Sequence, residues 1–197
     1  MDQIKIEGRS VRRLTENVQF VKSDKILNTD HAIQDIQKDV LHLNGNTLMI
    51  NGPDTLRCDS MVYYSKLDSG YAMGNVTFTQ KENNRRLTTP VFHYWQTEGF
   101  RGSSFIAEGY SRVEENDQLI IANRIQYDDD SQTMLLKENA SVEDPSRGIF
   151  GDEIILTYAD SLLEKIEVLN HAFAYNDLKV RIRENGPYQK QRDEMSG

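Results

Sequence analysis

The sequence predicts an all-β protein: an open antiparallel β-jelly roll, V-shaped with two facing sheets, built from two-strand repeats of about 30 residues. Three observations predict this fold. Two short sequence anchors alternate along the 197 residues at nearly constant spacing. Apolar side chains recur with a period of two, as in a half-buried strand. This alternation slips by one residue at each first anchor, which indicates that the strands bend.

The first anchor is an Asp, Asn or Pro inside a fixed frame of apolar and small residues. Leu or Ile stands three positions before it, a small residue stands one position before it, and an apolar residue follows two positions later. Successive copies are separated by 29, 31, 33 and 29 residues. The five copies fall at Asp30, Asp59, Pro90, Asn123 and Asp152.

The phase slip at the first anchor has a structural meaning. An unbroken strand would turn its apolar side chains outward halfway along its length, because side chains alternate between the two faces. A β-bulge or a sharp bend at the anchor removes this contradiction. Pro90 fits only where the ladder of hydrogen bonds is already interrupted. We therefore expect strands of about ten residues that bend at the first anchors.

The second anchor is a Gly, Asn or His position inside a strand. Its clearest copy is Gly74-Asn75-Val76-Thr77-Phe78, and the copies at positions 17, 46, 75, 109, 139 and 171 are 29, 29, 34, 30 and 32 residues apart. Gly and Asn tolerate the backbone of a bulge. A second set of bends is therefore expected at Asn17, Gly74, Asn75, Gly109 and Asn139.

Short turn signals separate the predicted strands, for example Asn51-Gly52-Pro53-Asp54 and Asp144-Pro145-Ser146-Arg147-Gly148. Strands joined by short turns are antiparallel, and bent strands stacked in a row form a trough between two facing sheets. The side chains expected to line this trough, and to bind lipid if it stays open, are Leu56, Met61, Tyr63, Leu87, Phe92, Tyr94, Ile120, Ile125, Tyr127, Ile149, Ile154, Leu156, Val76 and Phe78.

The repeats divide the chain into three parts. Residues 1–9 are expected to be an N-terminal extension, native or introduced, since Ile6-Glu7-Gly8-Arg9 resembles a protease linker site. The jelly-roll repeats are expected over residues 10–176. Residues 177–197 are expected to hold a strand and the start of a truncated further repeat, because Met195-Ser196-Gly197 resembles the beginning of a first-anchor strand.

Composition argues against several classes of function. The net charge of −8 makes nucleic acid an improbable partner. The single cysteine, Cys58, rules out an intrachain disulfide and a zinc site built on cysteines. The four histidines lie in different repeats, so no metal and no cofactor is expected. No catalytic motif, membrane-spanning stretch or signal peptide is visible, and Arg12-Arg13 and Arg85-Arg86 are expected to be ordinary exposed charges.

The alternation of a Leu-x-small-Asp-x-apolar-x-Tyr frame with Gly-Asn-Val-x-Phe resembles the OstA-like family, which includes LptA and the amino-terminal domain of LptD. Leu56 to Tyr63 and Gly74 to Phe78 carry the resemblance best, and it covers about residues 10–176. It implies a non-enzymatic periplasmic carrier or bridge that holds the acyl chains of lipopolysaccharide in its trough. It also implies end-to-end strand pairing with other jelly-roll envelope proteins, including copies of itself.

A plainer alternative stays open, because apolar strand faces more often form closed core than a ligand site. The chain would then be a β-solenoid carbohydrate-binding module or a structural interaction module with a closed core. Tightly packed sheets without an open end would favour that alternative, whereas an accessible apolar slot would favour lipid binding.

Overall fold

The computed structural model describes residues 2–6, 9–96, 103–160, 162–180 and 189–196. Within them the chain is all-β, with no helix, and the strands form one 14-stranded antiparallel sheet. The expected all-β class is therefore confirmed. The strands are β1 (Asp2–Ile6), β2 (Arg9–Lys22), β3 (Lys25–Asp35), β4 (Val40–Asn51), β5 (Asp54–Tyr64), β6 (Ser69–Gln80), β7 (Arg85–Gln96), β8 (Ser103–Glu115), β9 (Gln118–Asp128), β10 (Thr133–Glu143), β11 (Arg147–Ala159), β12 (Leu162–Leu169), β13 (Phe173–Val180) and β14 (Gln189–Ser196).

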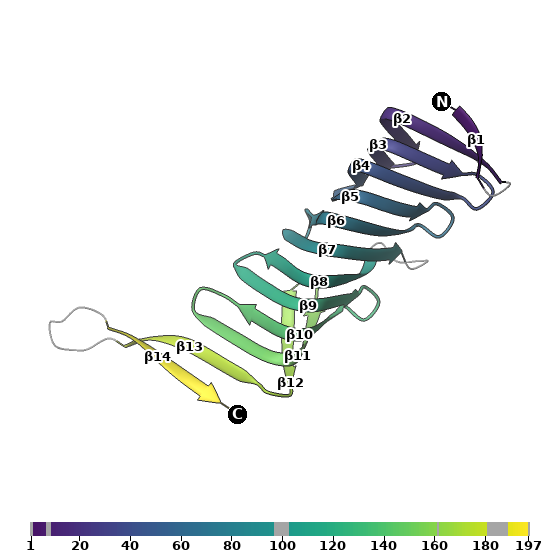
Figure 1. Cartoon of the computed structure of the whole chain (residues 1–197). Helices are drawn as coiled ribbons and strands as arrows, with labels where there is room; N and C mark the ends of the chain where they lie inside the picture. Colours follow the sequence, from purple (N-terminus) through teal and green to yellow (C-terminus); the bar gives the residue numbers. More distant parts are fainter. Residues whose placement is uncertain (1, 7–8, 97–102, 161, 181–188, 197) are drawn as a thin grey trace.

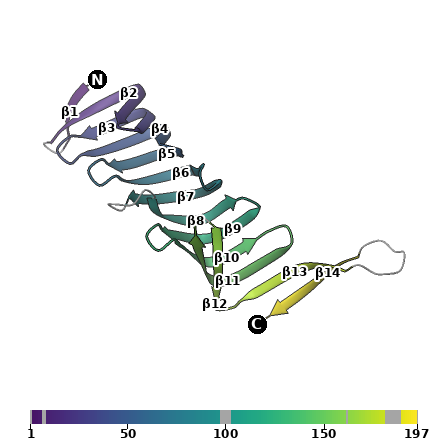
Figure 2. The same ribbon diagram turned by 180° about the vertical axis from the view of Figure 1, so that it is seen from behind.

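Each strand from β1 to β11 pairs with the next one along the chain, so the strands stack into an elongated body with the two termini at opposite ends (Figure 1). The order changes only after β11. One half of β11 pairs with β12 and the other half with β13, and β13 and β14 form a hairpin that projects from the stack (Figure 2). β1, which lies within the expected N-terminal extension, pairs with β2.

The strands bend where the pairing register shifts. Between β2 and β3, Thr15 pairs with His31 but Val18 pairs with Thr29, so two residues of β2 oppose only Asp30. The same two-against-one arrangement recurs opposite the other first anchors up to Asn123 and Asp152. The extra residue of each bulge thus belongs to the second-anchor strand, and the first anchor is the single residue that faces it.

Backbone geometry at the second anchors explains their residue types. Gly45, Gly74 and Gly109 have φ angles of 82°, 72° and 86°, in the left-handed region that favours glycine. Four asparagines in bulges of this kind also have positive φ, which asparagine tolerates better than most residues; two of them follow Gly45 and Gly74, and the other two follow Glu16 and Glu138. These asparagines are Asn17, Asn46, Asn75 and Asn139.

The two anchors contact each other across neighbouring strands. The side-chain amide of Asn75 donates to Oδ2 of Asp59 at 2.8 Å, and Asn46 donates to Asp30 at 2.7 Å. His171 Nδ1 lies 2.6 Å from Oδ2 of Asp152 in the last copy of the same contact. These pairs explain why an acidic first anchor is followed 16 to 19 residues later by Asn or His.

A substitution at Gly74 tests the close contact between the two anchors. A Cβ added there would lie less than 3.0 Å from the Asp59 carboxylate. Gly74→Ala is therefore expected to lower the free energy of unfolding by about 2–4 kcal/mol, since a clash adds to the left-handed backbone strain. Gly52→Ala is the matched control, because Gly52 also has positive φ but nothing lies within 4 Å of its added Cβ. Urea denaturation should show a loss of only about 1 kcal/mol there; equal losses would contradict the proposed clash.

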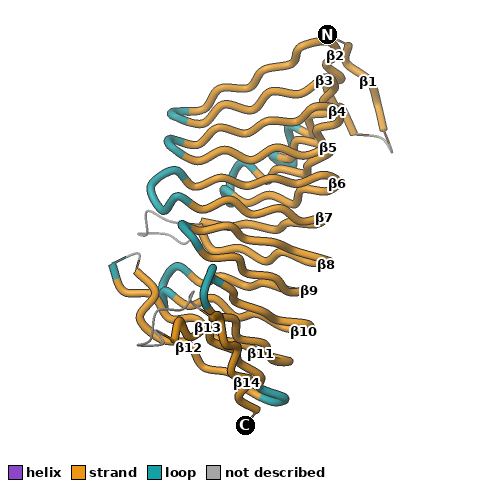
Figure 3. Tube along the Cα trace, turned by 90° about the vertical axis from the view of Figure 1, so that its left-hand side faces the viewer, coloured by secondary structure: helices purple, strands orange, loops and turns teal. Residues whose placement is uncertain are grey.

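The bends divide the strands into two arms that face each other. Arm one holds the strand halves next to the turns at residues 36–39, 65–68 and 129–132, and arm two holds the halves next to the turns at 23–24, 52–53 and 116–117. Figure 3 shows the successive strands as stacked rows joined by short loops. Apolar residues from both arms form one core cluster that runs from Val18 to Tyr158.

Candidate functional site

The space between the arms is the candidate site, and the structure packs most of it with side chains. Thirteen of the fourteen residues expected to line a trough are at most 5% exposed. The exception, Ile149, is half-buried and packs against the core. The structure therefore brings the expected trough residues together on one inner face, and over most of its length that face forms a closed core.

An aromatic cluster fills the middle of the inner face. Phe92 lies at its centre, with its ring centroid 5.1 Å from that of Phe78 and 5.3 Å from that of Phe105. Phe78 comes from arm two, whereas Phe92 and Phe105 come from arm one, so the cluster joins the arms. Tyr127 extends it through a stacked contact with Phe105 at 5.4 Å. Such pairs add about 0.5–1.5 kcal/mol each beyond simple burial.

Hollows lie between the arms at both ends of this core. The N-terminal mouth has a volume of about 290 Å³ and is lined by Phe20, Val21, Lys22, Lys25, Leu27, Gln34, Asp39, Val40, Leu41, Tyr63 and Ser65. The C-terminal mouth consists of a hollow of about 210 Å³ and one of about 450 Å³. The first of these is lined by Val142 and Ile149 from arm two and by Leu163 and Ile166 from β12.

A row of polar contacts closes the tips of the arms against each other, and we call it the seam. Lys22 donates to the carbonyl of Ser65 at 2.7 Å, Lys25 forms an ion pair with Asp68, and the Tyr158 hydroxyl donates to Glu115 at 3.1 Å. In each contact the partners are 43 residues apart, which is three strands along the stack. The Tyr94 hydroxyl makes a similar cross-arm contact with Met49 Sδ at 3.0 Å.

Arg85 is a buried part of the seam, so the expectation that it is an exposed charge was wrong. Its side chain is only 2% exposed, and its guanidinium lies 2.9 Å from Glu115 and 5.1 Å from the ring centroids of Tyr127 and Tyr158. Burial alone would lower the pKa of Arg85, but the Glu115 carboxylate, together with Tyr158 and Tyr127, raises it above its ordinary value. Arg85 is therefore a charged group that holds the two arms together. Arg12, Arg13 and Arg86 are exposed, as expected.

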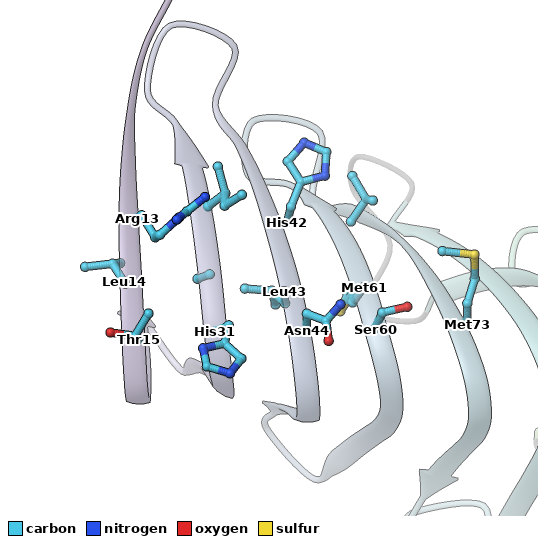
Figure 4. Close-up of a pocket in the computed structure, with 13 residues that line it drawn as sticks. Arg13, Leu14, Thr15, His31, His42, Leu43, Asn44, Ser60, Met61 and Met73 are labelled. Atoms are coloured by element: carbon cyan, nitrogen blue, oxygen red, sulfur yellow. The ribbon is translucent and has the colours of Figure 1, made fainter. Parts of the chain in front are cut away.

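A separate hollow of about 510 Å³ lies on strands β2 to β6 (Figure 4). Arg13, His31, His42 and Ser60 line it with side chains that alternate along their strands with core residues such as Met61. The alternation places these polar side chains on the outer face of arm one. This hollow therefore lies outside the space between the arms, although it is larger than the N-terminal mouth.

The remaining candidate groups are the single cysteine and the side-chain types that can bind a metal. Cys58 is buried, and burial together with the neighbouring Asp59 raises the pKa of its thiol to about 12. Within the described residues no three His, Cys, Asp or Glu side chains lie close enough to hold a metal ion. The same part of the chain contains no helix with the length and hydropathy needed to cross a membrane.

Sequence reasoning found the inner face but missed the seam and the mouths. Lys22, Lys25 and Glu115 each lie two positions from the outermost inward-facing apolar residue of their strand, namely Phe20, Leu27 and Val113. That spacing keeps them on the inner face and is visible in the sequence. The 43-residue offset of their partners depends on which tips face each other across the arms, and no sequence pattern reveals it.

The fold and the site define an open β-jelly-roll repeat protein. Its bent antiparallel strands stack in one row and fold over an apolar inner face that has a hollow at each end. A family model described as "LptA/(LptD N-terminal domain) LPS transport protein" matches residues 29–160. This match spans about two thirds of the chain, and the protein therefore belongs to that family. The family expected from the two anchors is thus confirmed.

Among solved structures, the chain is similar to the crystal structure of LptH from Pseudomonas aeruginosa, described as the LptA homologous periplasmic component of the conserved lipopolysaccharide transport device. The alignment covers 96% of both chains at 9% identity and has a TM-score of 0.29. No curated protein matches the sequence.

Proposed function

We propose that this protein is a non-enzymatic periplasmic component of lipopolysaccharide transport that carries or bridges the lipid, with its acyl chains held between the two arms. The observation that carries the proposal is the apolar inner face, continuous from one mouth to the other and lined by both arms. Membership of the lipopolysaccharide transport family supports the same cargo. Each buried methylene of an acyl chain contributes about 0.8 kcal/mol, so a few chains in the trough suffice for tight binding.

Binding requires the arms to part, and the chemistry of the seam supports this. Its contacts are a small number of hydrogen bonds and ion pairs at the tips, whereas the bends behind the core are fixed by continuous strands. Acyl chains can replace the contacts that the aromatic cluster loses, because both are apolar. We therefore infer that the closed core is the empty state of the trough.

The free strand edges support assembly with similar proteins. Among the described strands, β12 pairs only with β11, so its other edge has backbone groups available for a further strand. Leu163, Ile166 and Val168 of β12 are only partly buried at this end of the core. We propose that jelly-roll envelope proteins, including copies of this chain, pair there by adding a strand.

The second candidate function is a structural interaction or carbohydrate-binding module with a permanently closed core. The observation that favours it is the low exposure of the inner face, at most 5% for thirteen of its expected lining residues. On that view the hollows at the ends are only unfilled space beside terminal strands.

Photo-crosslinking separates the two functions. A benzoylphenylalanine placed at Tyr63 in the N-terminal mouth, at Ile149 in the C-terminal mouth or at Phe92 in the middle is expected to form adducts with lipopolysaccharide. The control position is Arg57, which is exposed on the outer face. Adducts at Arg57 alone, or none at all, would favour the closed module. Adducts at both mouths but not at Phe92 would show that lipid does not pass the aromatic cluster.

A further inference from the structure

We propose that the N-terminal mouth recognises the anionic phosphate groups of the lipid headgroup through Lys22 and Lys25. This inference rests on the proposed lipid-binding function and assigns the headgroup to particular residues. Three observations support it: the charged side chains around the two mouths, the short distance between the two lysines and the apolar residues of the mouth, and the present partners of the two lysine ammonium groups.

The N-terminal mouth has the layout of a site for an amphiphile. Its floor is apolar and comes from both arms, with Phe20 and Leu27 from arm two and Leu41 from arm one. Lys22 and Lys25 line the same hollow at the seam. Each lysine is two residues from an apolar floor residue on the same face of its strand. The Cα atom of the lysine is therefore about 7 Å from the Cα atom of that floor residue. A lipid phosphate lies at a similar short distance from the first acyl carbons.

The two lysines differ in their present partners. Within the described residues Lys22 donates only to the neutral carbonyl of Ser65 and has no carboxylate partner. Lys25 is only 6% exposed, pairs with Asp68 and lies 5.5 Å from the centroid of the Tyr63 ring. These contacts fix the Lys25 ammonium at the seam, which reduces the entropy lost when it binds a ligand.

The C-terminal mouth has the opposite charge. Its hollows are lined by five acidic residues and two basic ones, namely Glu115, Asp117, Glu143, Asp144, Glu164, Arg147 and Lys165. The N-terminal mouth is lined by two lysines and one acidic residue, Asp39; with Asp68, which pairs with Lys25, its lysines balance its carboxylates, and Lys22 faces a neutral carbonyl. An anionic headgroup is attracted to the first surface and repelled by the second, so the charges select the N-terminal mouth.

The test uses Lys22→Gln and the double variant Lys22→Gln/Lys25→Gln. The neutral fluorophore N-phenyl-1-naphthylamine reports the apolar space, and it is displaced either by lipopolysaccharide or by the same lipid with its phosphates removed. Each lysine near an anionic lipid is worth about fivefold in affinity, so the double variant should require about 10- to 30-fold more lipopolysaccharide. The phosphate-free lipid should displace the fluorophore equally from the variant and the unchanged protein.

Lys81→Gln is the matched control, because Lys81 is an exposed lysine that lines neither mouth. It should leave both affinities unchanged. Lys22→Gln alters an exposed side chain, so its expected loss of about fivefold tests the inference even if the double variant unfolds.

Two results would overturn the headgroup assignment and leave the lipid-binding function standing. In the first, the lysine variants bind lipopolysaccharide as the unchanged protein does. In the second, they lose affinity for the phosphate-free lipid by the same factor, which would show a purely structural role. If the unchanged protein bound neither lipid, the proposed function itself would fail, and the assignment with it.

Discussion

Glu115→Ala is expected to lower the free energy of unfolding by about 3–5 kcal/mol, because it leaves the Arg85 guanidinium buried without a counter-charge. The loss has a second part. The Tyr158 hydroxyl, which donates to the other carboxylate oxygen of Glu115, also loses its acceptor. The measurement is urea denaturation followed by circular dichroism at neutral pH.

Glu114→Ala is the control for this prediction. Glu114 also pairs with an arginine, Arg112, at 2.7 Å, but both side chains of that pair are nearly half exposed. Exposed ion pairs contribute about 0–1 kcal/mol, so this variant should unfold almost as the unchanged protein does. A similar loss in both variants would show that the burial of Arg85 has no energetic consequence.

The double variant Arg85→Met/Glu115→Leu removes both charges together. Replacing a buried ion pair by apolar side chains of similar volume is often neutral. We therefore expect the double variant to be more stable than Glu115→Ala alone. Because it also removes polar contacts that close the seam, it should bind N-phenyl-1-naphthylamine faster, which stopped-flow fluorescence measures.

Phe92→Ala is expected to lower the free energy of unfolding by about 3–5 kcal/mol, the usual cost of removing a fully buried aromatic ring. Phe92 is 0% exposed and contacts rings from both arms, so neighbouring side chains cannot fill its space without moving an arm. The same change should increase the amount of N-phenyl-1-naphthylamine that the protein binds, since it opens apolar space in the middle of the trough.

Tyr110→Ala controls for the loss of an aromatic ring as such. Tyr110 is 65% exposed, so its removal should change stability by no more than about 0.5 kcal/mol and leave fluorophore binding unchanged. If Phe92→Ala lost stability without gaining fluorophore binding, the cavity would have collapsed, and the middle of the core would not be a closed segment of the trough.

The fold could be predicted because its determinants are local and repeated. Asp59 with Gly74-Asn75 shows one bulge contact, and the same spacing at Asp30 with Asn46 shows another, so each copy supports the prediction of the others. The position of the extra bulge residue was less evident. Both anchors carry residues that tolerate a bulge, and only the pairing register shows that it lies beside the glycine or asparagine.

The site was harder to predict, because contacts across the seam join residues from different repeats. Arg85 follows a turn and precedes a second arginine, which is the usual setting of an exposed charge. Its burial depends on Tyr127 and Tyr158, which reach it from the opposite arm. The expected trough residues were found because period-two alternation places them on one face, but alternation does not indicate where that face is filled and where it is hollow.

The constant offset of the seam contacts affects how the trough can open. Lys22 with Ser65, Lys25 with Asp68, and Glu115 with Tyr158 each join a strand tip to a tip three strands further along, and the first two ties overlap. At about 4.8 Å between strands, each tie spans about 14 Å along the stack. If acyl chains occupy the trough as proposed, a chain that enters at the N-terminal mouth has to break two overlapping ties together, so its entry there would be cooperative.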